Sequence, residues 1–213
     1  QFYSRRFVMT YPNEQLPAGR PLKMAPAHTA MTAAGARWGC SWDLEVPLYF
    51  APDGFDEAPS LKRSNAFDIV GSECRAVRNA VGLLDITGFS RFEVTGPKAE
   101  AWLEKIFATK LPSAGRARLA VALGNDGRLK GDLTLFNWGD DRWWIMGSYY
   151  LRSWHMRWFK DHLESGDRLN DGVMIRDLGE EVAGFSLSGP HARAVVERLT
   201  DGAIGDLPFM GCG

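Results

Sequence analysis

The sequence predicts an α+β fold in which antiparallel sheets carry helices packed on one face. Three strand-like runs, 118–123, 129–136 and 142–147, are joined by short turns rich in glycine, aspartate and asparagine, the chemistry of β-hairpins. A second observation is a repeat, because residues 92–106 align without gaps on 185–199 and both read as a strand, a Gly-Pro pair and a helix. Turns this short cannot make the crossover that parallel strands need, so the sheet is expected to be antiparallel.

Residues 1–60 are expected to be irregular but ordered. Prolines and glycines interrupt this stretch throughout. Since proline restricts both its own backbone and that of the preceding residue, only a short helix at 27–34 is predicted. Aromatic side chains are frequent here, whereas a disordered linker would lack them. We therefore divide the chain into a Pro- and Gly-rich linker domain over residues 1–60 and a second domain over residues 61–213.

The second domain is predicted to mix helices and strands. Ser72 is expected to cap a helix that runs through Leu84. Each Gly-Pro pair is expected to open a helix, because a proline in the first helical turn leaves no backbone N–H unpaired. Around the hairpins we predict strands at 91–95, 173–175 and 182–187, and helices at 97–106, 150–163 and 190–199.

Composition and charge exclude several classes of function. A formal net charge of -1 offers no field that would attract nucleic acid, and no apolar run is long enough to span a membrane. The chain contains no Gly-x-Gly-x-x-Gly, Walker or Gly-x-Ser-x-Gly motif, and its 4 histidines and 3 cysteines are scattered. We therefore expect no dinucleotide site, no serine-hydrolase chemistry and no metal site, and we expect free thiols in a reducing compartment.

One acidic residue lies in the middle of a predicted strand. Alternation along residues 129–135 places the leucines, Leu129 among them, and Gly131 on the core side, and Asp132 on the other side. Aspartate is disfavoured inside strands. Two interpretations follow: a carboxylate that faces solvent on an open sheet, or an acid aimed into a pocket whose floor is the sheet.

The strand at 142–147 is the expected neighbour of this acid. Here Trp144, Met146 and Ser148 alternate on one face, where they could present an aromatic ring, a flexible apolar side chain and a hydroxyl to a ligand. Simple packing in the core is the competing interpretation.

Several short motifs follow one another along nearly the whole chain. They are Tyr11-Pro12-Asn13-Glu14, Lys62-Arg63-Ser64-Asn65-Ala66-Phe67, Val81-Gly82-Leu83-Leu84-Asp85, Gly127-Arg128-x-x-x-Asp132-Leu133-Thr134, Leu187-Ser188-Gly189-Pro190 and Leu207-Pro208-Phe209-Met210. Their order and spacing resemble the dimethylglycine and sarcosine dehydrogenase family. There the first segments form a linker after a flavin domain, and the later ones belong to a folate-binding aminomethyltransferase module that also occurs alone as the glycine cleavage T-protein.

The resemblance implies a function and a site. In this family a flavin domain oxidises an N-methyl amine, and the resulting iminium passes to tetrahydrofolate to give 5,10-methylenetetrahydrofolate. The acid beside the reactive amine of the folate falls on Asp132, where a carboxylate could stabilise the cationic iminium and direct the proton lost from nitrogen. The positions that line the folate pocket fall on Phe89, Leu119, Trp144, Met146 and Ser148.

The resemblance also concerns what lies outside these 213 residues. FAD would belong to a flavin domain before Gln1, against which this chain would pack, and further folate-holding residues would follow Met210. The T-protein-like fold is thus expected to be incomplete at its C-terminus, and the chain alone to be inactive. The expected ligands are a folate and an N-methyl amine, with no nucleic acid and no membrane. The bacterial cytoplasm or the mitochondrial matrix is the expected location.

Three alternatives to catalysis in a dehydrogenase stay open. The chain could be a non-catalytic binding or structural module between domains, or a stand-alone regulator that merely binds folate. It could also be a free-standing aminomethyltransferase of the glycine cleavage type. A mid-strand acid such as Asp132 favours a catalytic role, because a purely structural module does not need one.

Overall fold

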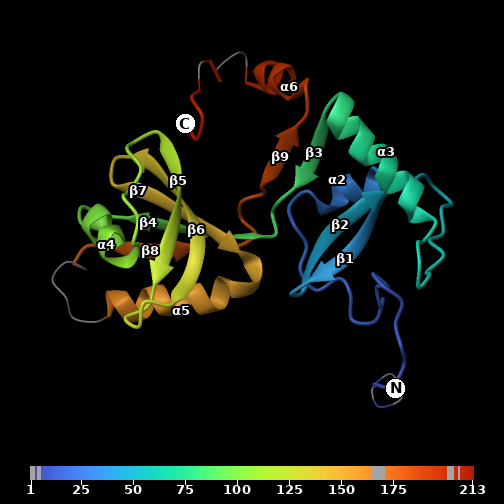
Figure 1. The fold of residues 1–213 in the computed structure, drawn as a ribbon, viewed down its shortest axis with the longest axis horizontal. Coiled ribbons are helices and arrows are strands. Elements are labelled where there is room, and N and C mark those ends of the chain that lie inside the picture. The colour runs from blue at the N-terminus through green and yellow to red at the C-terminus, as the bar shows by residue number, and fades with distance from the viewer. Residues whose placement is uncertain (1–2, 4–5, 165–170, 201–203, 206) are drawn as a thin grey trace. The chain divides into compact units, whose positions relative to one another are not determined.

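The fold consists of two compact units built from discontinuous stretches of chain. The structure is a computed structural model that describes residues 3, 6–164, 171–200, 204–205 and 207–213. Unit 1 comprises residues 1–85 and 185–198, and unit 2 comprises 86–184 and 199–213 (Figure 1). These units reflect contacts within the fold, whereas the division at residue 60 concerns the organisation of a longer protein and stays a prediction.

Unit 1 contains two small antiparallel sheets with helices beside them. Strand β1 (Ala36–Ser41) pairs with β2 (Leu44–Phe50), and β3 (Gly82–Asp85) pairs with β9 (Phe185–Ser188). Its helices are α2 (His28–Ala33), α3 (Ala66–Asn79) and α6 (Ala192–Leu199). The position of α2 confirms the short helix predicted at 27–34.

The β1–β2 hairpin corrects the expectation that residues 1–60 are otherwise irregular. Its two-residue turn is formed by Trp42 and Asp43, which adopt positive φ angles of 51° and 69°. This is the backbone of a type I′ turn, although neither residue is the glycine or asparagine usually found there. Pro47 is tolerated in β2 next to a register shift between Arg37 and Trp38.

The helix predicted to start at Ser72 begins earlier and ends earlier. Helix α3 starts at Ala66, and Ser72 lies inside it, where its hydroxyl donates to the carbonyl oxygen of Ile69 at 2.7 Å. A serine that bonds back to the preceding turn does not serve as a cap. Leu84, predicted to be helical, belongs to strand β3 instead.

Unit 2 is built on a 5-stranded sheet with the strand order β5-β6-β7-β4-β8. The strands are β4 (Phe89–Thr95), β5 (Arg116–Leu123), β6 (Leu129–Gly139), β7 (Arg142–Ser148) and β8 (Met174–Asp177). Every pairing in this sheet is antiparallel, and the two predicted hairpins, β5–β6 and β6–β7, are present. The predicted type of sheet is confirmed.

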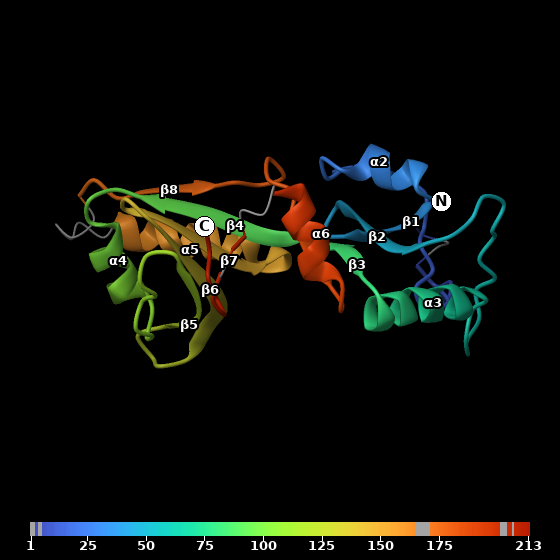
Figure 2. The ribbon, with the colours of Figure 1, turned by 90° about the horizontal axis from the view of Figure 1, so that it is seen from above.

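Helices α4 (Ala99–Ile106) and α5 (Arg152–Leu163) pack on one face of this sheet (Figures 1 and 2). A short 3-10 helix, Tyr149–Leu151, leads into α5. Trp102 of α4 and Phe92 of β4 both contact Phe159 of α5, with ring centroids 6.1 and 5.4 Å apart, and all three side chains are fully buried. Burying a large apolar side chain contributes roughly 1.5–3 kcal/mol, so this face holds the core. The prediction of helices on one face is confirmed.

The Gly-Pro repeat has the same backbone geometry in both copies. Gly96 follows β4 with a φ of 122°, and Gly189 follows β9 with a φ of 119°. A Cβ atom on Gly96 would overlap the carbonyl oxygen of Gly172, and one on Gly189 would lie 2.5 Å from that of Ala80. Both turns therefore need glycine for two reasons, the backbone angle and the close approach of another segment.

Two details of the predicted strands are corrected. Leu129 was expected on the core side but is 61% exposed, because it lies at the end of β6 beside a register shift between Ala122 and Leu123. The strand predicted at 182–187 begins only at Phe185. Within the ranges that the structure describes, no helix is long and apolar enough to cross a membrane.

Candidate functional site

The uncovered face of the 5-stranded sheet brings the predicted site residues together. On each strand the alternate residues are buried against α4 and α5, so the others share the opposite face. This face carries Asp132 on β6, Leu119 on β5, Phe89 on β4, and Trp144, Met146 and Ser148 on β7. We call it the open face.

Cross-strand pairing fixes how these residues are spaced. One row across the strands consists of Leu119, Thr134, Met146 and Arg91, and the next consists of Phe136, Trp144 and Glu93. At one end of the face, Val121 pairs with Asp132, and Phe89 pairs with Ser148. Strands lie about 4.8 Å apart and residues rise about 3.3 Å along a strand. The predicted residues therefore span a surface of roughly 13 Å by 14 Å, with the acid toward one end and Trp144 toward the other.

The carboxylate of Asp132 lies on an exposed surface. Leu119 is 70% exposed and Phe89 is 43% exposed, so apolar groups as well as the acid are accessible on the open face. Exposed apolar side chains are unusual on the outer face of a soluble sheet when several are grouped. The arrangement offers apolar side chains with the exposed carboxylate of Asp132 toward one end.

The strand that carries Asp132 is held from below by a histidine of α5. The Nε2 atom of His155 lies 3.2 Å from the carbonyl oxygen of Lys130, and a Cβ atom on Gly131 would lie 2.7 Å from the same nitrogen. Burial lowers the pKa of His155, against smaller raising effects of the Lys130 carbonyl and the Asp132 charge. Gly131 is thus needed where it is because the imidazole ring occupies the space beneath it.

Trp144 takes part in a polar network at the other end of the open face. Its Nε1 donates to Glu93 at 3.2 Å, and Glu93 also accepts from Arg142 at 3.0 Å and from Arg176 at 3.2 Å. Burial raises the pKa of Glu93, but the three hydrogen bonds outweigh it, and the net shift is downward. Because its N–H is already used, Trp144 can offer a ligand only its ring.

An aromatic strip continues from this tryptophan. Trp138 meets Trp144 edge to face at 5.3 Å and stacks on Phe136 at 6.2 Å, and the guanidinium of Arg142 lies 5.8 Å from the Trp144 ring. These contacts fix the position of the rings. Core packing, the competing interpretation for Trp144, does not describe it, since it lies on the face away from α4 and α5.

Sequence reasoning missed Arg91, which supports the open face from inside β4. Arg91 is 4% exposed, and its guanidinium donates to the carbonyl oxygens of Ile86 at 2.7 Å, Thr87 at 3.1 Å and Phe89 at 3.0 Å. It therefore fixes the backbone that presents Phe89. The alternation of Phe89, Arg91 and Glu93 along β4 was the available signal, and it places all three on one face.

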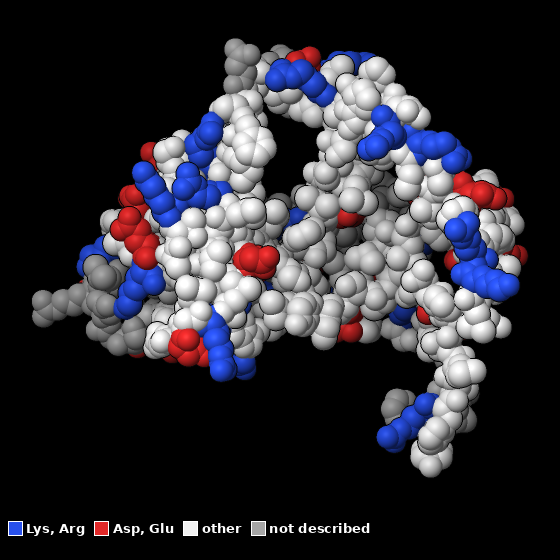
Figure 3. Space-filling model, in the orientation of Figure 1, with Lys and Arg blue, Asp and Glu red and all other residues white. Residues whose placement is uncertain are grey.

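Charge and metal chemistry add little to this site. Acidic and basic side chains are interspersed on the face shown in Figure 3, in keeping with the formal net charge of -1. Among the residues that the structure describes, no group of three histidine, cysteine, aspartate or glutamate side chains is placed to hold a metal ion. Cys40, Cys74 and Cys212 are free thiols.

Comparison with known proteins identifies the family. Residues 27–213 match the family model described as the GCVT N-terminal domain. The chain belongs to this family. A similar fold is seen in the crystal structure of glycine cleavage system aminomethyltransferase T from Bartonella henselae, with a TM-score of 0.64 and 20% identity over 84% of this chain and 44% of that one. At this identity the likeness shows the fold alone.

The curated relatives of this GCVT domain include proteins named as dehydrogenases and aminomethyltransferases. Mitochondrial dimethylglycine dehydrogenase of Mus musculus is 27% identical over 209 residues, 97% of this chain but 24% of that protein. An aminomethyltransferase of Herpetosiphon aurantiacus is 28% identical over 192 residues, 89% of this chain and 47% of that protein. The chain is therefore an aminomethyltransferase-type domain related to dimethylglycine dehydrogenase, and it spans from a quarter to a half of these relatives.

Proposed function

We propose that the open face binds the flat rings of tetrahydrofolate and that Asp132 assists the transfer of a one-carbon unit to it. One observation carries the proposal: residues from four different strands, which the family resemblance gives as folate contacts, lie on one face of one sheet.

The open face fits a flat heterocycle. Leu119, Met146 and Phe89 provide apolar and aromatic contact, and the extent of the surface estimated above suits a pterin joined to an aminobenzoyl ring. Bound tetrahydrofolate would supply the amines that accept the carbon, giving 5,10-methylenetetrahydrofolate. Trp144 would contribute a ring face, since its N–H is held by Glu93.

Asp132 has two roles in this proposal. Its carboxylate stabilises the positive charge of an iminium donor, an effect that grows as water is excluded from the site. It also accepts or directs the proton released when nitrogen forms its new bond to carbon. The β6 backbone, contacted from the other face by His155 at the carbonyl oxygen of Lys130, holds the acid in place. Placing two reactants together contributes more than proton transfer alone.

The donor is proposed to be an N-methyl amine oxidised elsewhere in a longer protein. The relationship to dimethylglycine dehydrogenase supports this context, in which FAD would reside in a separate flavin domain and this chain would pack against it. The mitochondrial name of that relative supports the matrix as one location, with the bacterial cytoplasm as the other. A free-standing aminomethyltransferase is equally compatible with the open face, and the aminomethyltransferase relative favours it as the second candidate.

The variant Asp132→Asn tests the role of the acid within the full-length protein. We expect methylene transfer to tetrahydrofolate to fall by about 100-fold or more, because a charged group and a proton acceptor are both lost. The rate of amine oxidation, measured with an artificial electron acceptor, should be unchanged. The rate of 5,10-methylenetetrahydrofolate formation in single turnovers is the measurement.

The matched control is Asp140→Asn, an exposed acid in the turn between β6 and β7 whose positive φ of 50° asparagine tolerates. It should leave the transfer rate unchanged. Equal rates in Asp132→Asn and wild type would remove Asp132 from the mechanism. Failure of a reduced folate to bind either form would favour a structural module.

A further inference from the structure

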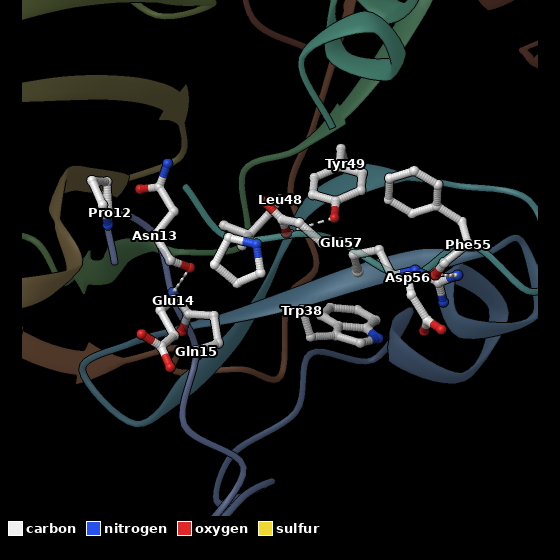
Figure 4. A pocket seen from close by; sticks show the side chains of 12 residues that line it. Pro12, Asn13, Glu14, Gln15, Trp38, Leu48, Tyr49, Phe55, Asp56 and Glu57 are labelled. Atoms are coloured by element: carbon white, nitrogen blue, oxygen red, sulfur yellow. Dashed lines mark hydrogen bonds between the residues drawn. The ribbon is translucent and has the colours of Figure 1, made fainter. Parts of the chain in front are cut away.

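Unit 1 contains a cavity that takes no part in the proposed folate site. Its volume is about 510 Å³, within the range of roughly 300–1,000 Å³ that is usual for small-molecule sites. Its walls come from residues 12–15, from β1 and β2, and from the loop at 55–59 (Figure 4). All of these segments belong to unit 1, so the cavity is formed within one unit.

Three aromatic rings line the cavity and are held in place by other contacts. Tyr49 and Phe55 meet edge to face, with ring centroids 6.3 Å apart and an interplanar angle of 88°. The ring of Trp38 stacks on His28 at 4.1 Å, and its Nε1 donates to the hydroxyl oxygen of Thr32 at 3.1 Å. One face of the indole is thus covered by His28, and Trp38 is among the residues that line the cavity.

The charged part of the lining is mostly anionic. Glu14, Asp56 and Glu57 line the cavity together with a single cationic side chain, Arg37. In the view of Figure 4, Asp56 and Glu57 lie between Trp38 and the pair formed by Tyr49 and Phe55.

The hydrogen bonds of this lining fix its charges. The guanidinium of Arg37 donates to the carbonyl oxygens of Pro52 at 3.2 Å and Phe55 at 3.1 Å, so it is engaged with backbone. Glu57 accepts a hydrogen bond from the Tyr49 hydroxyl at 2.7 Å, and burial followed by this bond raises the pKa of Tyr49 to about 12. The phenol thus stays a neutral donor, and the carboxylates leave the cavity with net negative charge.

The wall formed by residues 12–15 is also held by hydrogen bonds. The side-chain oxygen of Gln15 accepts from the backbone N–H of Cys40 at 3.1 Å, which joins residues 12–15 to β1. The backbone N–H of Tyr11 donates to Glu14 at 2.8 Å and orients that carboxylate. The cavity is therefore preorganised rather than a gap between loose segments.

We propose that this cavity binds a small organic cation with a methylated ammonium head. Aromatic ring faces attract such a cation through the ring quadrupole, and methyl groups on nitrogen fill apolar space that a bare ammonium would leave empty. The carboxylates supply the opposite charge. A carboxylate ligand would meet repulsion from the same groups, and a neutral apolar ligand would strip them of water without compensation. This site is independent of the proposed one-carbon transfer and is tested by binding alone.

Choline and 3,3-dimethyl-1-butanol form a matched pair of probes, because the second replaces the quaternary nitrogen by carbon and keeps the shape. Binding is followed in the ¹H–¹⁵N spectrum through the indole N–H of Trp38, assigned with Trp38→Phe. We expect saturable shifts with choline and an affinity for the neutral probe that is at least about fivefold weaker, the contribution expected of the charge.

The double variant Asp56→Asn, Glu57→Gln keeps the acceptor for the Tyr49 hydroxyl but removes two charges. It should weaken choline binding by at least about fivefold, whereas Asp53→Asn, an exposed acid of the same loop outside the lining, should leave it unchanged. Equal affinity for the two probes, no saturable shift with choline, or the same choline affinity in the double variant and Asp53→Asn would each overturn the proposal.

Discussion

At the scale of single residues, the core beneath the open face contains a histidine that is held neutral. His155 is 1% exposed, and a carbonyl oxygen can only accept, so the Nε2 atom facing Lys130 carries the hydrogen. Its Nδ1 is buried and has no hydrogen-bond partner among the described residues. A protonated ring would therefore bring an uncompensated charge into the core.

This burial predicts that stability falls as the pH is lowered. Burial lowers the pKa of His155 below its ordinary value of 6.5, so below that pH the unfolded chain binds a proton that the folded chain does not. The free energy of unfolding should therefore decrease as the pH falls through about 6.5 and below. In His155→Gln this decrease should be smaller, as measured by urea unfolding at pH 7.5 and pH 5.5.

The control for this experiment is His191→Gln, which changes an exposed histidine of unit 1. It should show the pH dependence of the wild type. His162 adds a second, separate contribution in the same direction, since burial and then Lys105 lower its pKa. An identical pH dependence in His155→Gln and wild type would mean that His155 does not remain neutral in the folded state.

At the scale of secondary structure, the two Gly-Pro turns are the most demanding backbone positions that the sequence marks. Substitution Gly96→Ala should lower the stability of unit 2 by about 2 kcal/mol or more, because it combines a positive φ with overlap of the Gly172 carbonyl. Gly127→Ala in the same unit is the control: its φ of 73° is also positive, but nothing lies within 4 Å of the added Cβ. That variant should lose about 1 kcal/mol.

Hydrogen exchange followed by mass spectrometry measures the difference. Peptides from β4 and β8 should lose protection in Gly96→Ala far more than in Gly127→Ala, because Gly96 follows β4 and its added Cβ would meet Gly172 just before β8. The corresponding change in the other copy, Gly189→Ala, should affect peptides of α3 and β3, since its Cβ would lie 2.5 Å from the Ala80 carbonyl oxygen. Equal losses of protection in Gly96→Ala and Gly127→Ala would show that the close approach of Gly172 does not contribute to the destabilisation.

The elements that the sequence predicted well are those whose signals are local. The hairpins β5–β6 and β6–β7 have turn residues that force the chain back on itself. A helix follows each Gly-Pro pair as expected, although each begins two residues later than predicted, at Ala99 and Ala192. The β1–β2 hairpin was missed because its turn contains neither glycine nor asparagine, and Trp42 is not a residue that favours positive φ. The start of α3 was misplaced because Ser72 can bond backward as readily as it can cap.

In the candidate site too, the sequence predicted features with local signals and missed contacts between elements. Alternation along β6 correctly placed Asp132 on the side away from the core. It could not predict that Glu93 holds the indole N–H of Trp144, because that contact joins residues 51 positions apart. Nor could it predict His155 beneath Gly131, where a helix meets a strand. Contacts between elements depend on packing, which a local pattern does not contain.

At the scale of the whole molecule, unit 1 is closed by a pairing between distant parts of the chain. Strand β3 ends at Asp85 and pairs with β9, which begins at Phe185, so the whole of β4 to β8 lies between two paired strands. Closing a loop between such distant segments costs conformational entropy, which the pairing must offset. No periodicity in the sequence reveals it.

This topology predicts that damage to β9 affects unit 1 and spares unit 2. In an antiparallel ladder only alternate N–H groups of a strand point toward a given neighbour. Of the variants Ser186→Pro and Leu187→Pro, one must therefore remove a hydrogen bond to β3, and the other serves as its control. The damaging variant should expose β3 to hydrogen exchange, with a loss of about 1–3 kcal/mol, while β5, β6 and β7 keep their protection. If β6 and β7 lose protection together with β3, the two units fold as one cooperative body, and the open face depends on the β3–β9 pairing as well as on its own sheet.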